Sequence, residues 1–475
     1  MFNLFRKPRD RKVFVIGLDC APPEFIFDQW RNELPNLNRL MSQGVWGELR
    51  SAIPCITVPA WASMTSSKDP GTLGFYGFRN RADYSYEKMT IATGASVKEP
   101  RVWDILGEHG KQVAVVGVPQ TYPPRPVNGN LVSCFLTPTI QKQYTHPASL
   151  GDEIRGWLNG ADYMVDVPQF RTDDKDFLLK QIYDMTERRF TVVKHMLKEK
   201  PWDFFMFVEM GTDRIHHAFW KYHDPLHPKH EPGNKYLQSI REYYHYVDRG
   251  IGEMLALLPE DTVVIVVSDH GAKRMDGGLC INEWLRREGL LALKEDPPVG
   301  TLTTFEKAQV DWPKTKVWSS GGYYARIFMN VQGREPQGVI PQADYERERD
   351  SLIERLAAIP GPDGKPMGNI SYKPRDVYKR VNNFAPDLIT YFGDLHWRAV
   401  GSFGHPDIYT FENDTGPDDA NHAQKGIFIM HDPRQKNNGR QLPEHQLMDF
   451  APTVLQLFNI PAPADMQGRS ILESK

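Results

Sequence analysis

Acidic and imidazole side chains recur where buried strands are expected to end. The apolar run Val13–Leu18 predicts a strand that Asp19 follows directly, and the run Thr262–Ser268 predicts another, followed by Asp269 and His270. The carboxyl ends of parallel strands meet at one edge of a sheet, where the functional residues of such folds lie. We therefore expect these three side chains to meet at that edge.

Two further segments add ligands of the same kinds. The strand predicted over Asp203–Met210 ends just before Asp213 and His217, which are four residues apart and so share one face of a helix. His422 lies immediately before a strand that starts near Gly426. Three Asp and three His are thus expected at the same end of one sheet.

Bringing three carboxylates together is unfavourable without a cation. At about 4 Å and an effective dielectric constant of ~20, each pair of like charges costs on the order of 4 kcal/mol. Carboxylates and neutral imidazoles are ligands for Zn²⁺ and for other divalent first-row metals, and these ligand types do not separate Zn²⁺ from Mn²⁺. The six side chains therefore predict a site for divalent cations.

Thr57 is the candidate nucleophile. It precedes Val58-Pro59, and because proline favours the first turn of a helix, Thr57 is expected at or near a helix N-cap, where an anion is favoured. A threonine hydroxyl is a weak nucleophile at neutral pH, but coordination to a metal lowers its pKa. Cys55 is a rival to which no base can be assigned, so we interpret it as a small buried residue.

Composition narrows the classes of protein. The 475 residues include 57 Lys and Arg against 60 Asp and Glu, a net charge of −3, which argues against a protein that coats nucleic acid. Hydrophobic residues make up 40% of the chain, enough for a substantial core. A small anionic substrate needs only local positive charge, so it remains compatible with this balance.

The sequence predicts a cytoplasmic protein without a membrane span. No stretch approaches the ~18 consecutive apolar residues that a span needs. Residues 1–9 form a basic tail, and the apolar run behind them is shorter than that of a signal peptide. The four cysteines are scattered without a Cys-x-x-Cys pair, so reduced thiols are expected. The oligomeric state cannot be read from the sequence.

Strands and helices alternate along the chain. Further strands are predicted over Lys111–Pro119, Asp387–Tyr391 and Gly426–Met430, and helices over Lys175–Lys198, Lys235–Leu258, Asn282–Gly289, Asp344–Ala358 and Leu447–Phe458. This alternation predicts an α/β fold with a central, mainly parallel sheet flanked by helices on both faces. One domain is expected over residues 10–475, with candidate insertions or lid segments at 75–100, 122–170 and 397–421.

Taken together, these residues resemble the alkaline phosphatase superfamily and, within it, the type I phosphodiesterase/nucleotide pyrophosphatase group. The motifs that carry the resemblance run in order over most of the chain and include Val13–Asp19, Thr57–Thr65, Asp213–His217, Ser268–Gly271 and Asn421–Gly426. The resemblance implies an alkaline phosphatase-like fold and a site for two metals. One metal would be held by Asp213, His217 and His422, and the other by Asp19, Asp269, His270 and the Thr57 hydroxyl. Thr57 would attack phosphorus to give a covalent phospho-threonine, which water would then hydrolyse.

The sequence departs from the family's pattern in two places. Ala60 stands where nucleotide pyrophosphatases usually carry Asn, and Leu73 stands where His is common, so the contact to a phosphoryl oxygen is left open. Lys273, Arg274 and Asn282 are candidates for that contact. The competing interpretations are solvated surface charge for the first two and helix capping for Asn282.

The expected function is that of a metal-dependent phosphoric ester hydrolase, phosphodiesterase- or nucleotide pyrophosphatase-like, acting on a small phosphorylated substrate. Its cofactors would be two divalent ions, Zn²⁺ before Mn²⁺. The alternatives are a phosphomonoesterase, a metal-dependent phosphoglycerate mutase-like enzyme, and a metal-stabilised binding protein without turnover. A sulfatase is disfavoured because Cys55 lacks the Cys/Ser-x-Pro-x-Arg context.

Two other polar segments are interpreted as ordinary structure. The acidic run Asp414 to Asp419 is expected to be a solvated or lid-forming loop near His422. Among the histidines that follow Asp213, His216 is a candidate for a supporting contact behind the ligands.

Overall fold

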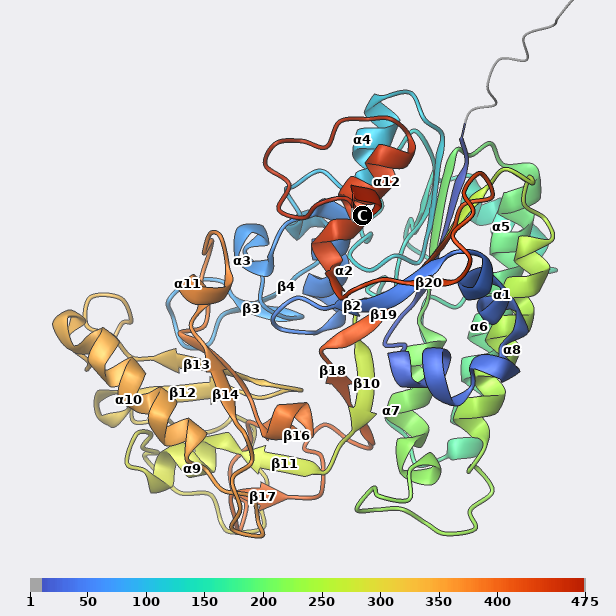
Figure 1. Cartoon of the computed structure of the whole chain (residues 1–475). Coiled ribbons are helices and arrows are strands. Elements are labelled where there is room, and N and C mark those ends of the chain that lie inside the picture. The colour runs from blue at the N-terminus through green and yellow to red at the C-terminus, as the bar shows by residue number, and fades with distance from the viewer. Residues whose placement is uncertain (1–10, 474–475) are drawn as a thin grey trace, which may run out of the picture.

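The computed structural model describes residues 11–473 and is built around a ten-stranded sheet (Figure 1). In spatial order its strands are β20 (Arg440–Gln441), β2 (Val45–Arg50), β19 (Lys425–His431), β9 (Val263–Val267), β1 (Val13–Leu18), β8 (Phe204–Glu209), β5 (Val113–Val116), β6 (Gly129–Val132) and β7 (Thr145–His146), with β21 (His445–Gln446) paired to β2. The strands from β9 to β6 run parallel, whereas β19 and β7 run antiparallel to their neighbours. The predicted α/β fold with a mainly parallel central sheet is confirmed.

Helices cover both faces of the sheet (Figure 1). One face carries α1 (Pro35–Gln43), α5 (Leu150–Trp157), α6 (Lys175–Glu199), α7 (Gly211–His223) and α8 (Ser239–Leu255), and the other carries α2 (Thr57–Ser66), α4 (Val102–Glu108) and α12 (Phe450–Leu457). Alternate side chains of each central strand enter the two cores, as in β1, where Ile16 belongs to the first and Val15 to the second. Because both sides are buried, the strands are continuously apolar.

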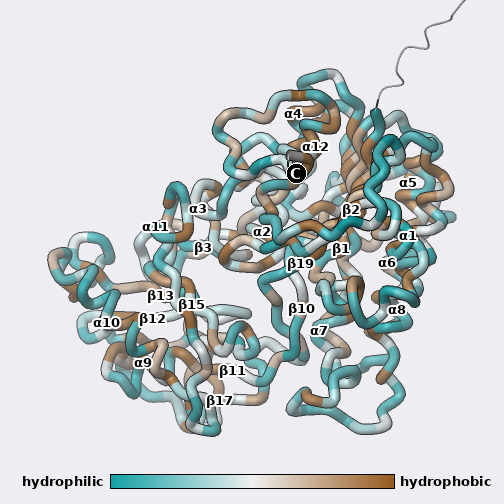
Figure 2. The backbone as a smooth tube through the Cα atoms, viewed as in Figure 1, coloured by the Kyte–Doolittle hydropathy of each residue, from teal (hydrophilic) through white to brown (hydrophobic). Residues whose placement is uncertain are grey.

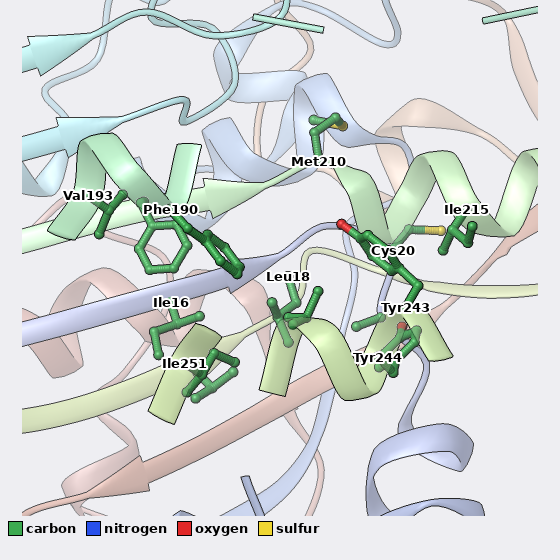
Figure 3. Packing of buried hydrophobic residues seen from close by; sticks show 14 of the residues in the cluster. Ile16, Leu18, Cys20, Phe190, Val193, Met210, Ile215, Tyr243, Tyr244 and Ile251 are labelled. Atoms are coloured by element: carbon green, nitrogen blue, oxygen red, sulfur yellow. The ribbon is translucent and has the colours of Figure 1, made fainter. Parts of the chain in front are cut away.

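The first core joins β1 to the helices α6 and α8. Figure 3 shows Ile16 and Leu18 of β1 in one apolar cluster with Phe190 of α6 and Ile251 of α8. In Figure 2 the apolar segments concentrate around the central strands and α12, while the peripheral loops are hydrophilic. The strand ends that bear polar residues are therefore fixed to a rigid, well-packed layer.

A smaller lobe is formed by the chain between β11 and β17 (Figure 1). It contains one sheet of β12 (Val317–Ser320), β13 (Ala325–Met329), β15 (Leu388–Tyr391) and β14 (Ile370–Tyr372), a second sheet of β16 (Trp397–Val400), β11 (Gly277–Cys280) and β17 (Tyr409–Thr410), and helices α9 (Ile281–Arg287), α10 (Tyr345–Ala357) and α11 (Pro374–Val377). The strand predicted over Asp387–Tyr391 is present as β15, but it pairs antiparallel with β13 and β14 and does not join the central sheet. The lobe has an apolar core of its own, which includes Leu279 and Ile327.

The three segments expected as insertions lie in different places. Residues 75–100 carry the hairpin of β3 (Arg79–Arg81) and β4 (Met89–Ile91). Residues 122–170 supply β6 and β7 to the central sheet, and α5 to one of its faces, so this segment extends the core. Residues 397–421 lead from the smaller lobe into β18 (Ala420–Ala423), which pairs with β10 (Gly271–Arg274). Among residues 11–473, no helix combines the length and hydrophobicity that crossing a membrane requires. All four cysteines are free and buried.

Candidate active site

The candidate site lies beyond the carboxyl ends of β1, β8 and β9. Asp19 follows β1, Asp213 lies in the first turn of α7 after β8, and Asp269 and His270 form a turn between β9 and β10. Because β19 runs antiparallel to β9, its start lies at this same edge, and β18 just before it brings His422 to the site. The structure thus gathers residues that the sequence placed at strand ends.

The ligand-type side chains form two buried clusters. In each cluster the potential ligand atoms lie within 4.8 Å of one another. The first, which we call the helix cluster, consists of Cys20, Asp213, His217 and His422. The second, the strand-end cluster, consists of Asp19, Asp269 and His270. The Asp and His residues divide as the family resemblance implies, whereas nothing in the sequence pointed to Cys20.

The two imidazoles of the helix cluster direct their Nε2 atoms at each other. His422 Nδ1 lies 2.9 Å from the carbonyl oxygen of Cys55, and His217 Nδ1 lies 2.7 Å from Asp418 Oδ1, so both Nδ1 atoms act as donors. The two Nε2 atoms are 3.3 Å apart, and Asp213 Oδ1 lies 3.2 Å from that of His217. When both rings are neutral, as metal binding requires, two lone pairs and a carboxylate oxygen point at one place, which is the donor set of a divalent metal.

Charges around the helix cluster stabilise its carboxylate. Burial alone would raise the pKa of Asp213, but neighbouring His217 and Arg214 lower this pKa well below its ordinary value. Arg214 Nη1 donates to Asp213 Oδ2 over 2.6 Å, which leaves Oδ1 for the cluster. Burial works against protonation of His217, yet Asp418 and Asp213 raise the pKa of His217 to about 10. A cation would therefore displace a proton from Nε2 of His217.

The strand-end cluster contains acceptors without a matching donor. His270 Nδ1 donates to the carbonyl oxygen of Gly271 over 3.0 Å, and burial lowers the pKa of His270 to about 4, so its Nε2 is bare. This nitrogen lies 3.1 Å from Asp269 Oδ2 and 3.9 Å from Asp19 Oδ1. In the described part of the chain, neither of these buried oxygens has a hydrogen-bond partner. Buried polar atoms left in this way call for an ion or another partner.

The pKa values of the two strand-end carboxyls support the same interpretation. Burial, followed by the charge of Asp213, raises the pKa of Asp19 well above its ordinary value. Burial and then the charge of Asp19 raise the pKa of Asp269 in the same way. A cation among these oxygens would reverse both shifts, because an opposite charge favours the ionised form. The residues of both clusters thus fit divalent metals.

Thr57 lies beside the strand-end cluster. Its Oγ1 is 3.4 Å from His270 Nε2, and the side chain is buried. Thr57 is the first residue of α2 and directly follows the N-cap residue Ile56, so it lies near the helix N-cap, as predicted. The start of this ten-residue helix favours an anion at the hydroxyl, because the helix dipole is positive there.

The nucleophile helix also holds one of the carboxylates. Trp61, one turn after Thr57, donates its indole N–H to Asp19 Oδ2 over 2.6 Å. This bond leaves Asp19 Oδ1 directed at the cluster. A Cβ at position 17 would lie 2.6 Å from the Trp61 ring, so the glycine there makes room for the indole. Sequence reasoning missed this role of Trp61, because its partner lies 42 residues away on another element.

Residues of the smaller lobe, and of the segment that leads from it to β18, contact the histidines of the helix cluster. Asp418 is buried at the end of the acidic run, where a solvated or lid-forming loop was expected, and its other oxygen accepts bonds of 3.0 Å from Arg171 and from the Tyr323 hydroxyl. The Tyr323 ring stacks 5.0 Å from that of His217 and 4.4 Å from that of His422. No sequence signal could have found these contacts, because the segments involved are about 100 to 250 residues apart.

The three candidates for substrate contact have protein partners. Lys273 Nζ donates to the carbonyl oxygen and the carboxylate of Asp394, and Arg274 pairs with Asp276. The amide of Asn282 bonds the backbone of β12 and of the segment after β16. None of these residues belongs to either cluster, so a role in substrate binding stays a prediction. His216 bonds the Tyr244 hydroxyl over 3.2 Å within the apolar core behind the site.

The central sheet with Asp and His clusters at its carboxyl edge defines an alkaline phosphatase-like protein. A model of the type I phosphodiesterase/nucleotide pyrophosphatase family matches residues 13–418, and the chain belongs to this family. It is accordingly a phosphodiesterase- or phosphatase-type hydrolase of the alkaline phosphatase superfamily. No match was found among curated protein sequences.

Solved structures share this fold at low sequence identity. Human ectonucleotide pyrophosphatase/phosphodiesterase 5 superposes with a TM-score of 0.55 and 12% identity, over 97% of this chain and 98% of that one. An inactive variant of the murine protein in complex with AMP gives 0.55 and 12%, over 96% of each chain. Phosphonoacetate hydrolase from Sinorhizobium meliloti 1021, in complex with phosphonoformate, gives 0.58 and 16%, over 95% of this chain and 96% of that one. At these identities the similarity establishes the fold.

Proposed function

We propose that this protein hydrolyses a phosphodiester or pyrophosphate bond of a small molecule, with Thr57 as the nucleophile and two divalent cations as cofactors. The observation that carries the proposal is the position of Thr57 Oγ1 at the start of α2, 3.4 Å from His270 Nε2 and beside carboxylate oxygens that have no hydrogen-bond partner among residues 11–473. Membership of the phosphodiesterase family supports the same reaction class.

Each cluster would hold one cation. Asp213, His217 and His422 would bind the first, and the strand-end cluster with the Thr57 hydroxyl would bind the second. When bound, the cations supply positive charge that lowers the pKa of the threonine hydroxyl and offsets negative charge on the phosphoryl oxygens. Zn²⁺ is the first choice and Mn²⁺ the second.

The chain's own groups act in two half-reactions. In the first, a bond forms between Thr57 Oγ1 and phosphorus while the bond to the leaving alkoxide breaks, and the hydroxyl proton leaves, in net, with the alcohol. In the second, water breaks the bond between phosphorus and Oγ1, which restores the hydroxyl and releases a monoester. Trp61 keeps Asp19 in position, and the start of α2 favours the anionic phosphoryl group near Oγ1.

A diester is favoured over a monoester because of the charges around the clusters. A monoester carries one more negative charge, which a nearby unpaired arginine would have to balance. Arg214 is already paired with Asp213 and Asp166, and Arg171 with Asp418. Small phosphorylated ligands remain the substrate class, in keeping with the AMP bound by the murine relative. A cytoplasmic location stays a prediction.

The test compares rates on an aryl phosphodiester and its monoester after loading with Zn²⁺ or Mn²⁺. We expect the diester to react faster, and Thr57→Ala to lose at least about 10³-fold of the rate while binding the same amount of metal. Thr57→Ser, which keeps a hydroxyl, should retain measurable turnover. A monoester preference would support a phosphomonoesterase, and undiminished hydrolysis by Thr57→Ala would overturn the nucleophile. No hydrolysis of any ester by metal-loaded protein would favour a binding protein.

A further inference from the structure

Cys20 occupies an unusual position between the two clusters. It directly follows Asp19, and its backbone has a φ of +63°, which residues with a side chain rarely adopt. Its side chain is fully buried and belongs to the apolar core shown in Figure 3, together with Ile215 and Tyr244. Glycine would take this backbone conformation without strain. The protein nevertheless has a cysteine at this position.

The thiol sulfur also lies with the ligand atoms of the helix cluster. Cys20 Sγ and the potential ligand atoms of Asp213, His217 and His422 all lie within 4.8 Å of one another. Ligands around a tetrahedral zinc ion are about 3.5 Å apart, given bonds of about 2.0 to 2.3 Å. A shift of roughly one ångström therefore brings this set of one sulfur, one oxygen and two nitrogens into a tetrahedral arrangement.

Independent features of the cluster point to a cation at this place. The Nε2 atoms of His217 and His422 face each other across 3.3 Å, and both rings are buried and tied by Nδ1 to other acceptors. The thiol now donates to the carbonyl oxygen of Gly271 over 3.4 Å. If this bond breaks, the oxygen keeps a hydrogen-bond partner, because it also accepts from His270 Nδ1.

We infer that Cys20 is a fourth protein ligand, as a thiolate, to the cation held by Asp213, His217 and His422. The S–H bond breaks, the proton leaves to solvent, and a bond forms between sulfur and metal. The inference rests on the proposed function for the presence of a metal in this cluster. It raises the number of protein ligands in the helix cluster from three to four, which equals the number in the strand-end cluster once the Thr57 hydroxyl is included.

A sulfur ligand has a consequence for metal selectivity. Soft thiolates favour Zn²⁺ over Mn²⁺ or Mg²⁺, so Cys20 makes the helix cluster selective for zinc. The strand-end cluster has only oxygen and nitrogen ligands and lacks this preference.

The test replaces zinc by Co²⁺ in the full-length protein. A thiolate bound to Co²⁺ gives an intense charge-transfer absorption in the near ultraviolet, which we expect in the wild type and in Cys134→Ser but not in Cys20→Ser or Cys20→Ala. In chelator competition, Cys20→Ser should weaken binding of Zn²⁺ on the order of tenfold or more while changing that of Mn²⁺ by less than about threefold. Cys20→Gly guards against misfolding, because it removes the thiol and relieves the positive φ, so its melting temperature in the metal-free state should not fall.

The outcomes separate this inference from the proposed function. A thiolate band that persists in Cys20→Ser, or equal zinc affinity in Cys20→Gly and the wild type, overturns the ligand role and leaves hydrolysis by Thr57 untouched. If the band depends on Cys20 but the metal-loaded protein hydrolyses no ester, the ligand role of Cys20 is supported and the proposed function is overturned. A wild type that binds no Co²⁺ overturns both.

Discussion

The helix cluster and the strand-end cluster are built from the same residue types but balance their charges differently. In the helix cluster, His217 and Arg214 lower the pKa of Asp213 and so stabilise it as a carboxylate. In the strand-end cluster, burial raises the pKa values of Asp19 and Asp269, and each has an oxygen without a partner in the described structure. The protein's own charges thus stabilise the ionised carboxylate of the helix cluster. In the strand-end cluster, ionised carboxylates are unfavourable until a cation binds.

The largest expected effect comes from neutralising one carboxylate in each cluster. Asp213→Asn and Asp269→Asn should each reduce hydrolysis by at least about 10³-fold, because each removes a charge next to the reaction. In metal-free protein their stabilities should diverge. Asp269→Asn should stabilise the fold by on the order of 1 kcal/mol, because burial and the charge of Asp19 disfavour ionisation of the carboxyl at this position. Asp213→Asn should destabilise it by about 2 kcal/mol, because it loses charged partners.

Urea unfolding after exhaustive chelation measures these changes, with circular dichroism as the check on native structure. Asp261→Asn, at an exposed position, is the matched control and should shift the free energy of unfolding by less than about 0.5 kcal/mol. Shifts of the same sign at Asp213 and Asp269 would contradict the contrast between the clusters.

The next largest effect concerns the outer contact of the helix cluster. Asp418→Asn weakens the bond that fixes His217 Nδ1, so we expect metal affinity and activity to fall by about 10- to 100-fold. Asp419→Asn is the neighbouring control: its side chain is also buried, but it belongs to neither cluster. Equal losses in the two variants would show a general structural effect and no orientation of His217.

The sequence could predict what depends on local pattern. All five predicted helices are present, and in α6 (Lys175–Glu199) the prediction over Lys175–Lys198 differs by one residue, because apolar periodicity and buried strands are local properties. The three Asp residues, with His217 and His270, were expected together because parallel strands bring their carboxyl ends to one edge. His422 reaches the same edge for a different reason, since the strand after it runs antiparallel to β9.

What the sequence could not predict depends on contacts between distant segments. Trp61 follows a helical pattern that fits a core residue equally well, and only the structure shows its bond to Asp19. Asp418 sits in an acidic run typical of solvated loops, and its burial depends on Arg171 and Tyr323. The placement of β15 outside the central sheet likewise depends on strand partners that its sequence does not specify.

A smaller effect is expected from the outer contact of the strand-end cluster. Trp61→Phe keeps an aromatic ring but loses the N–H that holds Asp19 Oδ2, so we expect activity to fall by about tenfold. Trp103→Phe, in the same apolar core but without a bond to either cluster, is the matched control. Metal titration should show weaker binding of one equivalent only in Trp61→Phe. Unchanged affinity would assign Trp61 to packing alone.

The smallest effect is a pH dependence that separates the two clusters in metal-free protein. The pKa of Asp269 in the folded state lies above its unfolded value of about 3.9. Between those two values the folded state retains a proton that the unfolded state has lost, so stability falls as pH rises. The free energy of unfolding of Asp269→Asn does not fall in this way. The difference between the variant and the wild type in this free energy should therefore be close to zero below pH ~3.5 and grow by at most about 1.4 kcal/mol per pH unit above pH ~4. Saturating Zn²⁺ should abolish this growth, because a cation favours the ionised carboxylate. An advantage that does not change between pH 4 and pH 7 would show that Asp269 is not held protonated, and the contrast with Asp213 would then lose its electrostatic basis.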